Sequence, residues 1–173
     1  MVERELGQVY YFSEEEVELV FKRMTEGYQV KSCAVEVYGR CLEIPEAANG
    51  VAKISFRELC QGNTSAADYL AICKQFHSIC ITRIPIFRGT SMREEARRFV
   101  TLIDILYDNR VKLVAHIEAP LKDLFRLNEG NKNVDVDIRD ANGSLFTGEE
   151  EIFAVDRTIS RLYEMESLSW WSR

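Results

Sequence analysis

Arginines are the side chains in this sequence best suited to contact a phosphate group. Arg157 and Arg161 lie four residues apart in a predicted helix, so both project from one side of it. Arg97 and Arg98 lie in the first turns of another predicted helix. A guanidinium is a planar fork that matches phosphate oxygens, which makes these arginines candidates to sense a nucleotide bound elsewhere. The competing interpretation is ion pairing within the fold, with carboxylates at Glu94, Asp104, Asp156 and Glu164.

A nucleophilic or acid–base active site is not predicted. Cys73 and His77 are four residues apart in a predicted helix and share a face, but that face is apolar, which favours packing over catalysis. His116 lies in a presumed central strand, where we expect a hydrogen-bonded core or strand-end histidine. We therefore assign no catalytic residue.

A metal site is not predicted either. The cysteines are odd in number and none forms a Cys-x-x-Cys pair, so we expect mostly buried, reduced thiols. Asp135, Asp137 and Asp140 have a D-x-D-x-x-D spacing, but the later glycine and glutamate of an EF-hand calcium loop are missing. We interpret that stretch as a solvated loop. The cysteines are Cys33, Cys41, Cys60, Cys73 and Cys80.

The sequence lacks the phosphate-binding loop of a nucleotide triphosphatase. Such a loop reads G-x-x-x-x-G-K-[ST], and none of the 9 glycines is followed by lysine. The nearest acidic strand end is Glu118, a single carboxylate that cannot build a magnesium site. We therefore expect no cofactor for this chain alone, and ATP with Mg²⁺ only when it is joined to a P-loop module.

Bulk properties restrict the class of partner. The 173 residues suffice for one domain, or one domain with a small appendage. The net charge of −6 disfavours wide contact with nucleic acid or anionic membrane. No apolar run reaches the roughly 20 residues that cross a bilayer, so no transmembrane segment is predicted. The N-terminal residues resemble neither a signal peptide nor a transit peptide, which by itself favours a cytoplasmic location.

A βαβ pattern between Ile79 and Pro120 organises the chain. An apolar strand-like run comes first, then a long amphipathic helix, then the apolar run 111–117. Ser91 is the predicted helix cap, with Glu94 three residues later, and Asn109 is expected to end the helix in the left-handed conformation. This predicts an α/β fold with a parallel βαβ core covered by helices, its two strands side by side or nearly so.

The segments before this core predict a small antiparallel region near the N-terminal third. A short strand within 7–12 precedes a helix capped by Ser13 and stopped by Gly27. Strands within 33–37, 41–44 and 51–56 follow, the second ended by Pro45. The helix 66–77 has a predicted apolar side, formed by Tyr69, Leu70, Cys73 and Phe76.

After the core we predict a short helix over 121–127 and a last helix over 152–165. The tail exposes Trp170 and Trp171 unless they dock, which makes it a candidate contact for a protein partner. We divide the chain into an N-terminal helix with antiparallel strands (1–62), an αβαβα core (63–127), an acidic loop or insertion (128–151) and a C-terminal helix with its tail (152–173).

Several segments, in this order, are specific to one family. They read GRCLEIPEAANGVAKISFRELC, SAADYLAICKQFHSICI, EARRFVTLIDILYDNRVKLV and DRTISRLYEMES. On them the chain resembles the C-terminal part of the ZapE-like, or lactation-elevated (AFG-type), AAA+ ATPase family. The resemblance covers most of residues 39–167.

The resemblance implies an ATP-hydrolysing protein whose P-loop module, with both Walker motifs, lies N-terminal to the matched region. Its partners would be that missing module, or neighbouring subunits. Eukaryotic members of the family are mitochondrial and linked to protein quality control, and bacterial members act in cell division. The rival hypothesis is a stand-alone, non-catalytic α/β protein-interaction module.

The sequence departs from the family pattern at several places. Arg83 stands where members tend to carry aspartate, and His116-Ile117 stands where they tend to carry Ser-Ala. The stretch 128–151 looks like a lineage insertion. The missing Walker motifs imply that the chain is inactive alone and that Met1 is an internal start of a truncated or split gene.

Overall fold

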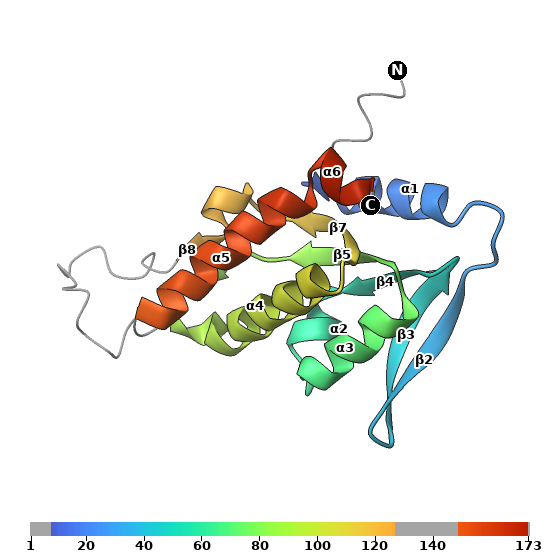
Figure 1. Cartoon of the computed structure of the whole chain (residues 1–173), viewed down its shortest axis with the longest axis horizontal. Helices are drawn as coiled ribbons and strands as arrows, with labels where there is room; N and C mark the ends of the chain where they lie inside the picture. The colour runs from blue at the N-terminus through green and yellow to red at the C-terminus, as the bar shows by residue number, and fades with distance from the viewer. Residues whose placement is uncertain (1–7, 127–148, 173) are drawn as a thin grey trace.

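The computed structural model describes residues 8–126 and 149–172 of the protein. The described residues form a mixed α/β fold, which confirms the predicted fold class (Figure 1). In chain order its elements are β1 (Tyr10–Tyr11), α1 (Glu14–Met24), β2 (Lys31–Val37), β3 (Arg40–Ala48), β4 (Val51–Ser55), α2 (Phe56–Cys60), α3 (Ala66–Gln75), β5 (Ser78–Ile84), β6 (Phe87–Arg88), a 3₁₀ turn (Thr90–Met92), α4 (Arg93–Asp108), β7 (Lys112–Ile117), a 3₁₀ turn (Leu121–Asp123), β8 (Phe125–Arg126), α5 (Glu149–Met165) and α6 (Leu168–Trp171).

One sheet joins the parallel and antiparallel strands. Its strand order is β1-β7-β5-β4-β3-β2, with β1, β7, β5 and β4 parallel and with β3 and β2 antiparallel to their neighbours. Strands β5 and β7 are adjacent, which confirms the predicted βαβ unit around α4. Strands β4 and β5 are also parallel neighbours, joined by α2 and α3, so the unit is repeated.

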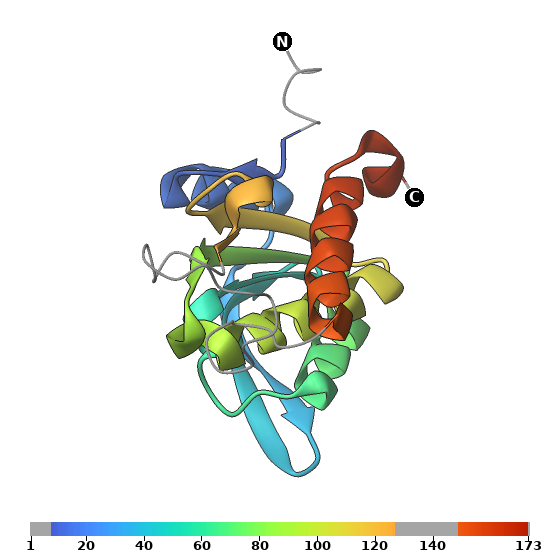
Figure 2. The ribbon, with the colours of Figure 1, turned by 90° about the vertical axis from the view of Figure 1, so that its left-hand side faces the viewer.

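Helices cover the two faces of the sheet unequally (Figures 1 and 2). Helices α2, α3 and α4 lie on one face, and α5 packs on α4. There Ile54, Ile81 and Phe99 are buried in the main core. Helix α1 packs against β4, β5 and β7 on the other face, where Val17 and Phe21 are buried in a smaller cluster. Each large apolar side chain buried in this way stabilises the fold by roughly 1.5–3 kcal/mol.

Two of the predicted ends of α1 and α4 differ from those observed. Ser13 occupies the N-cap of α1, as predicted, but its side chain makes no capping bond. Ser91 lies inside a 3₁₀ turn, so Met92 rather than Ser91 is the N-cap of α4. Asn109 has φ −94° and does not adopt the left-handed conformation, which Arg110 takes instead, with φ 58°.

Three other local predictions were wrong. Strand β3 continues through Pro45, because a register shift opposite it, between Lys31 and Cys33, accommodates a residue without an amide hydrogen. The helix expected over 121–127 is a 3₁₀ turn followed by β8. Leu70 is 42% exposed, while Ile72 takes its place in the core. The predicted loop with Asp135, Asp137 and Asp140 lies outside the described residues.

Candidate functional site

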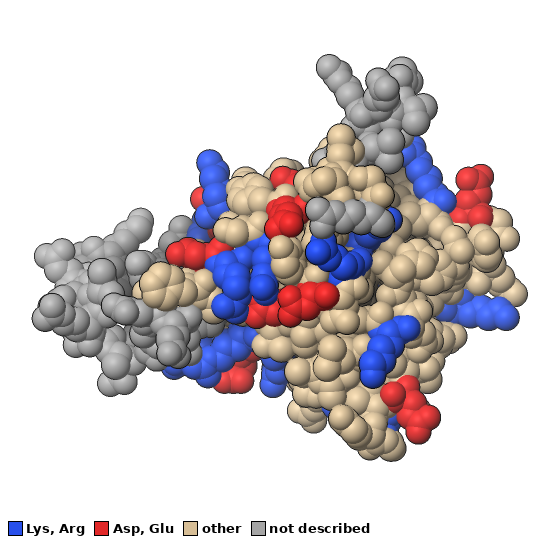
Figure 3. Space-filling model, viewed as in Figure 1, with Lys and Arg blue, Asp and Glu red and all other residues tan. Residues whose placement is uncertain are grey.

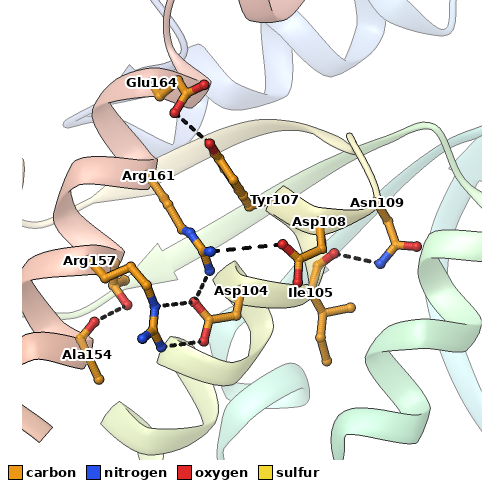
Figure 4. A network of polar contacts seen from close by, with 10 residues as sticks. Asp104, Ile105, Tyr107, Asp108, Asn109, Ala154, Arg157, Arg161 and Glu164 are labelled. Carbon is orange, nitrogen blue, oxygen red and sulfur yellow. Dashed lines mark hydrogen bonds and ion pairs between the residues drawn. The ribbon is translucent and has the colours of Figure 1, made fainter. Parts of the chain in front are cut away.

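The two C-terminal arginines meet at one carboxylate of the central helix. Arg157 binds Asp104 through two bonds, Nε to Oδ1 at 3.3 Å and Nη2 to Oδ2 at 2.8 Å. Arg161 donates from Nη1 to Oδ1 of the same Asp104 at 2.5 Å. Both arginines come from α5 and reach across to α4, as Figure 4 shows. The structure therefore brings together one of the two predicted pairs of arginines.

Further contacts fix the position of Arg161. Its Nη2 is 3.9 Å from Asp108 Oδ1, and its guanidinium carbon is 4.5 Å from the centre of the Tyr107 ring. The Tyr107 hydroxyl donates to Glu164 Oε2 at 2.7 Å, and this hydrogen bond raises the pKa of Tyr107. We call Asp104, Tyr107, Asp108, Arg157, Arg161 and Glu164 the α4–α5 cluster. From outside it is a patch where basic and acidic side chains alternate (Figure 3).

The C-terminal tryptophans support this cluster from one end. Trp170 is 3% exposed and stacks on Tyr107, with ring centres 5.1 Å apart. The guanidinium carbon of Arg110, whose backbone φ is 58°, lies 5.2 Å from the centre of the Trp170 ring, in a cation–π contact. Trp171 donates from Nε1 to the Met165 carbonyl at 3.1 Å. The tail is therefore docked on the fold, which removes the ground for treating it as an exposed partner contact.

Arg97 and Arg98 lie outside the α4–α5 cluster. Arg97 pairs with Glu94 one turn away, at 3.6 Å. Arg98 donates to the carbonyl oxygen of Cys60 in α2, at 3.1 Å. They are about 10 Å from Asp104 along the helix axis. The four arginines therefore belong to two separate surfaces, and a role for all four would need a contact at each surface.

Ion pairing, the competing interpretation, is found for three of the four arginines. Asp104 pairs with Arg157 and Arg161, and Glu94 pairs with Arg97. Ion pairs with this degree of exposure stabilise a fold by only about 0–1 kcal/mol each, so little free energy is needed to separate them. Arg157 is 47% exposed and uses two of its N–H groups on Asp104. Its other N–H groups face no described acceptor, so a phosphate could bind while the pair with Asp104 remains.

The chemistry that the cluster can perform is electrostatic. Guanidinium groups bind anions and stabilise charge that develops on a phosphate, but they break no bond by themselves. No group of three His, Cys, Asp or Glu side chains suited to a metal occurs in residues 8–126 and 149–172. Glu118, the carboxylate expected at a strand end, accepts a hydrogen bond from the amide of Ile86 at 3.3 Å.

The histidines and thiols have structural roles. Helix α3 ends at Gln75, so His77 is not on the face of Cys73 as predicted; its ring nitrogens lie 2.8 Å from Ser78 Oγ and from the Asn49 carbonyl. His116 accepts from the amide of Arg83, which confirms a hydrogen-bonded histidine. All five cysteines are free, but only Cys60 and Cys80 are buried, so the expectation of mostly buried thiols was wrong. Burial raises the pKa of both Cys60 and Cys80 to about 12, so neither is a nucleophile at neutral pH.

One signal in the sequence could have located the cluster. Asp104 and Asp108 are four residues apart on α4, and Arg157 and Arg161 are four apart on α5. Two such pairs of opposite charge match when their helices pack side by side. The role of Tyr107 had no comparable signal, because its neighbours Trp170 and Glu164 are distant in sequence.

Comparison with known proteins identifies a family that the chain matches. A family model described as AFG1-like ATPase matches residues 9–173. The chain is 33% identical over 183 residues to Lactation elevated protein 1 homolog B of Danio rerio, covering 95% of this chain and 36% of that protein. It is 34% identical over 143 residues to an uncharacterised protein of Schizosaccharomyces pombe, covering 79% of this chain and 31% of that protein.

A bacterial relative is more distant. The cell division protein ZapE of Escherichia coli is 29% identical over 147 residues, covering 85% of this chain and 33% of ZapE. The chain thus spans about a third of the length of the curated relatives it matches.

No solved structure matches it. Within the part that the structure describes, no helix is both long and apolar enough to cross a membrane.

Proposed function

Because the chain belongs to the AFG1-like ATPase family, we propose that it is the C-terminal α/β unit of an ATP-hydrolysing machine and is inactive without a P-loop module. The match over residues 9–173 supports this proposal. So does the sequence, which has no G-x-x-x-x-G-K-[ST] loop. ATP and Mg²⁺ would be bound by the P-loop module of the same protein or of a partner chain.

The α4–α5 cluster would be the nucleotide-responsive surface of this unit. The observation that carries this role is that Arg157 and Arg161 share one carboxylate at the surface. Arg157 is the more exposed of the two, at 47% against 23%, and would contact the phosphate. Arg161, held by Asp104, Asp108 and Tyr107, would keep Asp104 and hence Arg157 in place.

The test is a chimaera in which a P-loop module from the family precedes this chain. Each of the four arginines is changed to alanine, and ATP turnover is measured with Mg²⁺ present. An arginine that stabilises phosphate in the transition state contributes about 10³–10⁵ in rate, so Arg157→Ala should lower kcat by about that factor. Arg157→Lys should recover little of it, since lysine lacks the planar fork.

Controls separate this role from a folding defect. Arg97→Ala and Arg98→Ala change arginines outside the cluster and should leave kcat within about twofold of the parent. Nucleotide affinity and thermal stability are measured for every variant. Unchanged turnover in all four variants would remove the nucleotide-sensing role, and ATP hydrolysis by the 173-residue chain alone would overturn the proposed need for a P-loop module.

The place of action is a further part of the proposal. We propose that the protein is mitochondrial and serves protein quality control, as the family resemblance of the sequence implies. Imaging of the family-length protein that contains this unit, beside a mitochondrial marker, tests the location. An evenly cytoplasmic signal would contradict it.

The rival function is a stand-alone interaction module. Removing the tail is a poor test of it. Deleting residues 168–173 would remove Trp170 from its buried site against Tyr107, so lost partner binding would not identify the tail as the contact.

A further inference from the structure

Strand β2 has an open edge. It is the last strand of the sheet, and no described strand lies on its outer side (Figure 1). Tyr38 and Gly39 form a two-residue hairpin turn, and Val37 pairs with Arg40 as its closing pair. In such a hairpin, bonding alternates along the strand. Val35 and Val37 therefore bond to β3, while Ala34 and Glu36 direct their amide and carbonyl groups outward.

Helix α3 turns this edge into a groove. A cavity of about 720 Å³ runs between β2 and α3, a size within the range of binding pockets. The helix contributes positions at helical spacing along one stripe, among them Leu70, whose side chain is 42% exposed. This part of the molecule, low in Figure 3, carries few charged side chains. Residues on the α3 side of the groove are Ala67, Leu70, Ala71, Lys74 and Gln75.

Tyr38 is an independent sign that the groove has a ligand. It lies at the mouth of the groove with φ 47°, a conformation in which a bulky side chain is strained and asparagine or glycine is preferred. Its side chain is 92% exposed, so packing within the fold does not explain a tyrosine there. Tyrosine is enriched at protein interfaces because one side chain offers both apolar area and a hydroxyl.

The charge of Lys74 indicates which kind of side chain a ligand of the groove would carry. Lys74 lines the groove, is exposed, and has no ion-pair partner among the described residues. An acidic side chain on the ligand would complement it. The outward amides and carbonyls of Ala34 and Glu36 require a ligand with an extended backbone, because only a strand supplies donors and acceptors at matching spacing.

We propose that the β2–α3 groove binds an extended segment of a partner polypeptide as an additional strand of the sheet. The segment pairs with the outer edge of β2, places alternate apolar side chains against Leu70 and Tyr38, and directs an aspartate or glutamate to Lys74. This interaction does not depend on ATP hydrolysis or on the α4–α5 cluster, so it can fail or succeed independently of the proposed function.

Hydrogen exchange of the free chain tests whether the edge is open. The amides of Val35 and Val37 should exchange slowly, because they bond to β3, while those of Ala34 and Glu36 should exchange at least about tenfold faster. Slow exchange at all four positions would show that a second copy or another segment of the chain already covers the edge, and would overturn the proposal. Light scattering identifies a second copy as a dimer.

A library of random seven-residue peptides, displayed on phage, supplies the probe. Selection on the full chain should enrich peptides that alternate apolar residues and contain an acidic one. A synthetic peptide of the enriched sequence is then measured for affinity and should slow the exchange of the Ala34 and Glu36 amides. Failure to enrich any such pattern, or unchanged exchange at these two amides, would contradict the proposal.

Substitutions then locate the binding site. Leu70→Asp should weaken binding by about tenfold or more. Leu19→Asp makes the same change at a leucine that is 58% exposed on α1, which covers the opposite face, and should leave affinity unchanged. Lys74→Glu should weaken the acidic peptide by several fold and favour the same peptide with its acid changed to lysine. Equal losses in the Leu70 and Leu19 variants would overturn the assignment.

Tyr38→Asn separates binding from folding. Asparagine fits the turn better than tyrosine, so the melting temperature should rise, while affinity for the peptide should fall several fold. A tyrosine needed only by the fold would give the opposite result, with lower stability and unchanged affinity. That outcome would remove Tyr38 from the binding surface.

Discussion

Asp104 is the residue on which the contact between α4 and α5 most depends. Its carboxylate accepts from Arg157 and from Arg161, and its side chain is 26% exposed. Without this negative charge the two guanidinium groups would lose the counter-ion that they share, and among the described ion pairs the longer contact of Arg161 with Asp108 would remain. A single carboxylate thus decides whether both arginines stay at their observed positions.

Asp104→Asn tests this dependence, because it removes the charge and keeps the shape. We expect the free energy of unfolding to fall by about 1 kcal/mol, since two ion pairs worth about 0–1 kcal/mol each are lost together. Urea denaturation measures the change. Asp156→Asn, at an exposed position of α5 with no ion pair among the described residues, is the matched control and should change stability by less than about 0.5 kcal/mol. Equal effects would show that Asp104 is dispensable.

At the scale of elements, helix starts differ in how firmly they are fixed. Ser55 begins α2 with a complete capping box: its Oγ accepts from the Glu58 amide at 3.2 Å, and its own amide donates to Glu58 Oε2 at 3.0 Å. Ser13 begins α1 with a suitable backbone but no side-chain bond. The first turn of α2 is therefore held locally, whereas α1 depends on the burial of Val17 and Phe21.

Alanine substitutions at the two serines should separate these cases. Ser55→Ala should lower the free energy of unfolding by about 0.5–2 kcal/mol, the usual effect of losing a cap. Ser13→Ala should cost only a few tenths of a kcal/mol, since no capping bond is lost. Thermal melting followed by circular dichroism gives both values. A larger loss at Ser13 than at Ser55 would contradict the described geometry.

The whole molecule is held together by contacts between distant parts of the chain. Strand β1 adds to the parallel sheet beside β7, with Tyr10 opposite Ala115. The Tyr10 hydroxyl donates to the carbonyl of Leu162 in α5 at 2.6 Å, and burial raises the pKa of Tyr10, which keeps that hydroxyl protonated. The first strand and the last long helix are thus bonded to each other directly.

Tyr10→Phe tests this long-range bond. Loss of a buried hydrogen bond should reduce the free energy of unfolding by about 0.5–1.5 kcal/mol, and amides of α5 near Leu162 should exchange faster. Tyr11→Phe is the comparison variant, because the Tyr11 hydroxyl donates to the carbonyl of Gln8, three residues away in the sequence, at 2.7 Å. A loss at Tyr11 as large as that at Tyr10 would show that the bond to α5 contributes nothing special.

The parts that could be predicted from sequence are those fixed by local periodicity. The apolar stripe of α4 and the buried strands on either side have strong patterns, so the unit β5–α4–β7 was predicted correctly. Leu70 was misplaced because apolarity alone does not tell which side of a short helix meets the sheet. Asp104 could be named only among several partners, because its choice depends on how α4 and α5 pack.

The bond between β1 and α5 has a mechanical consequence. In a longer protein, tension on the chain ahead of Val9 would act on a strand paired over two residues only. That strand would separate before the rest of the sheet, and Tyr10 would pull on the backbone one residue beyond Arg161. Movement of a preceding module would therefore reach the arginines as a shift of α5, together with the core side chains of Val9 and Tyr10.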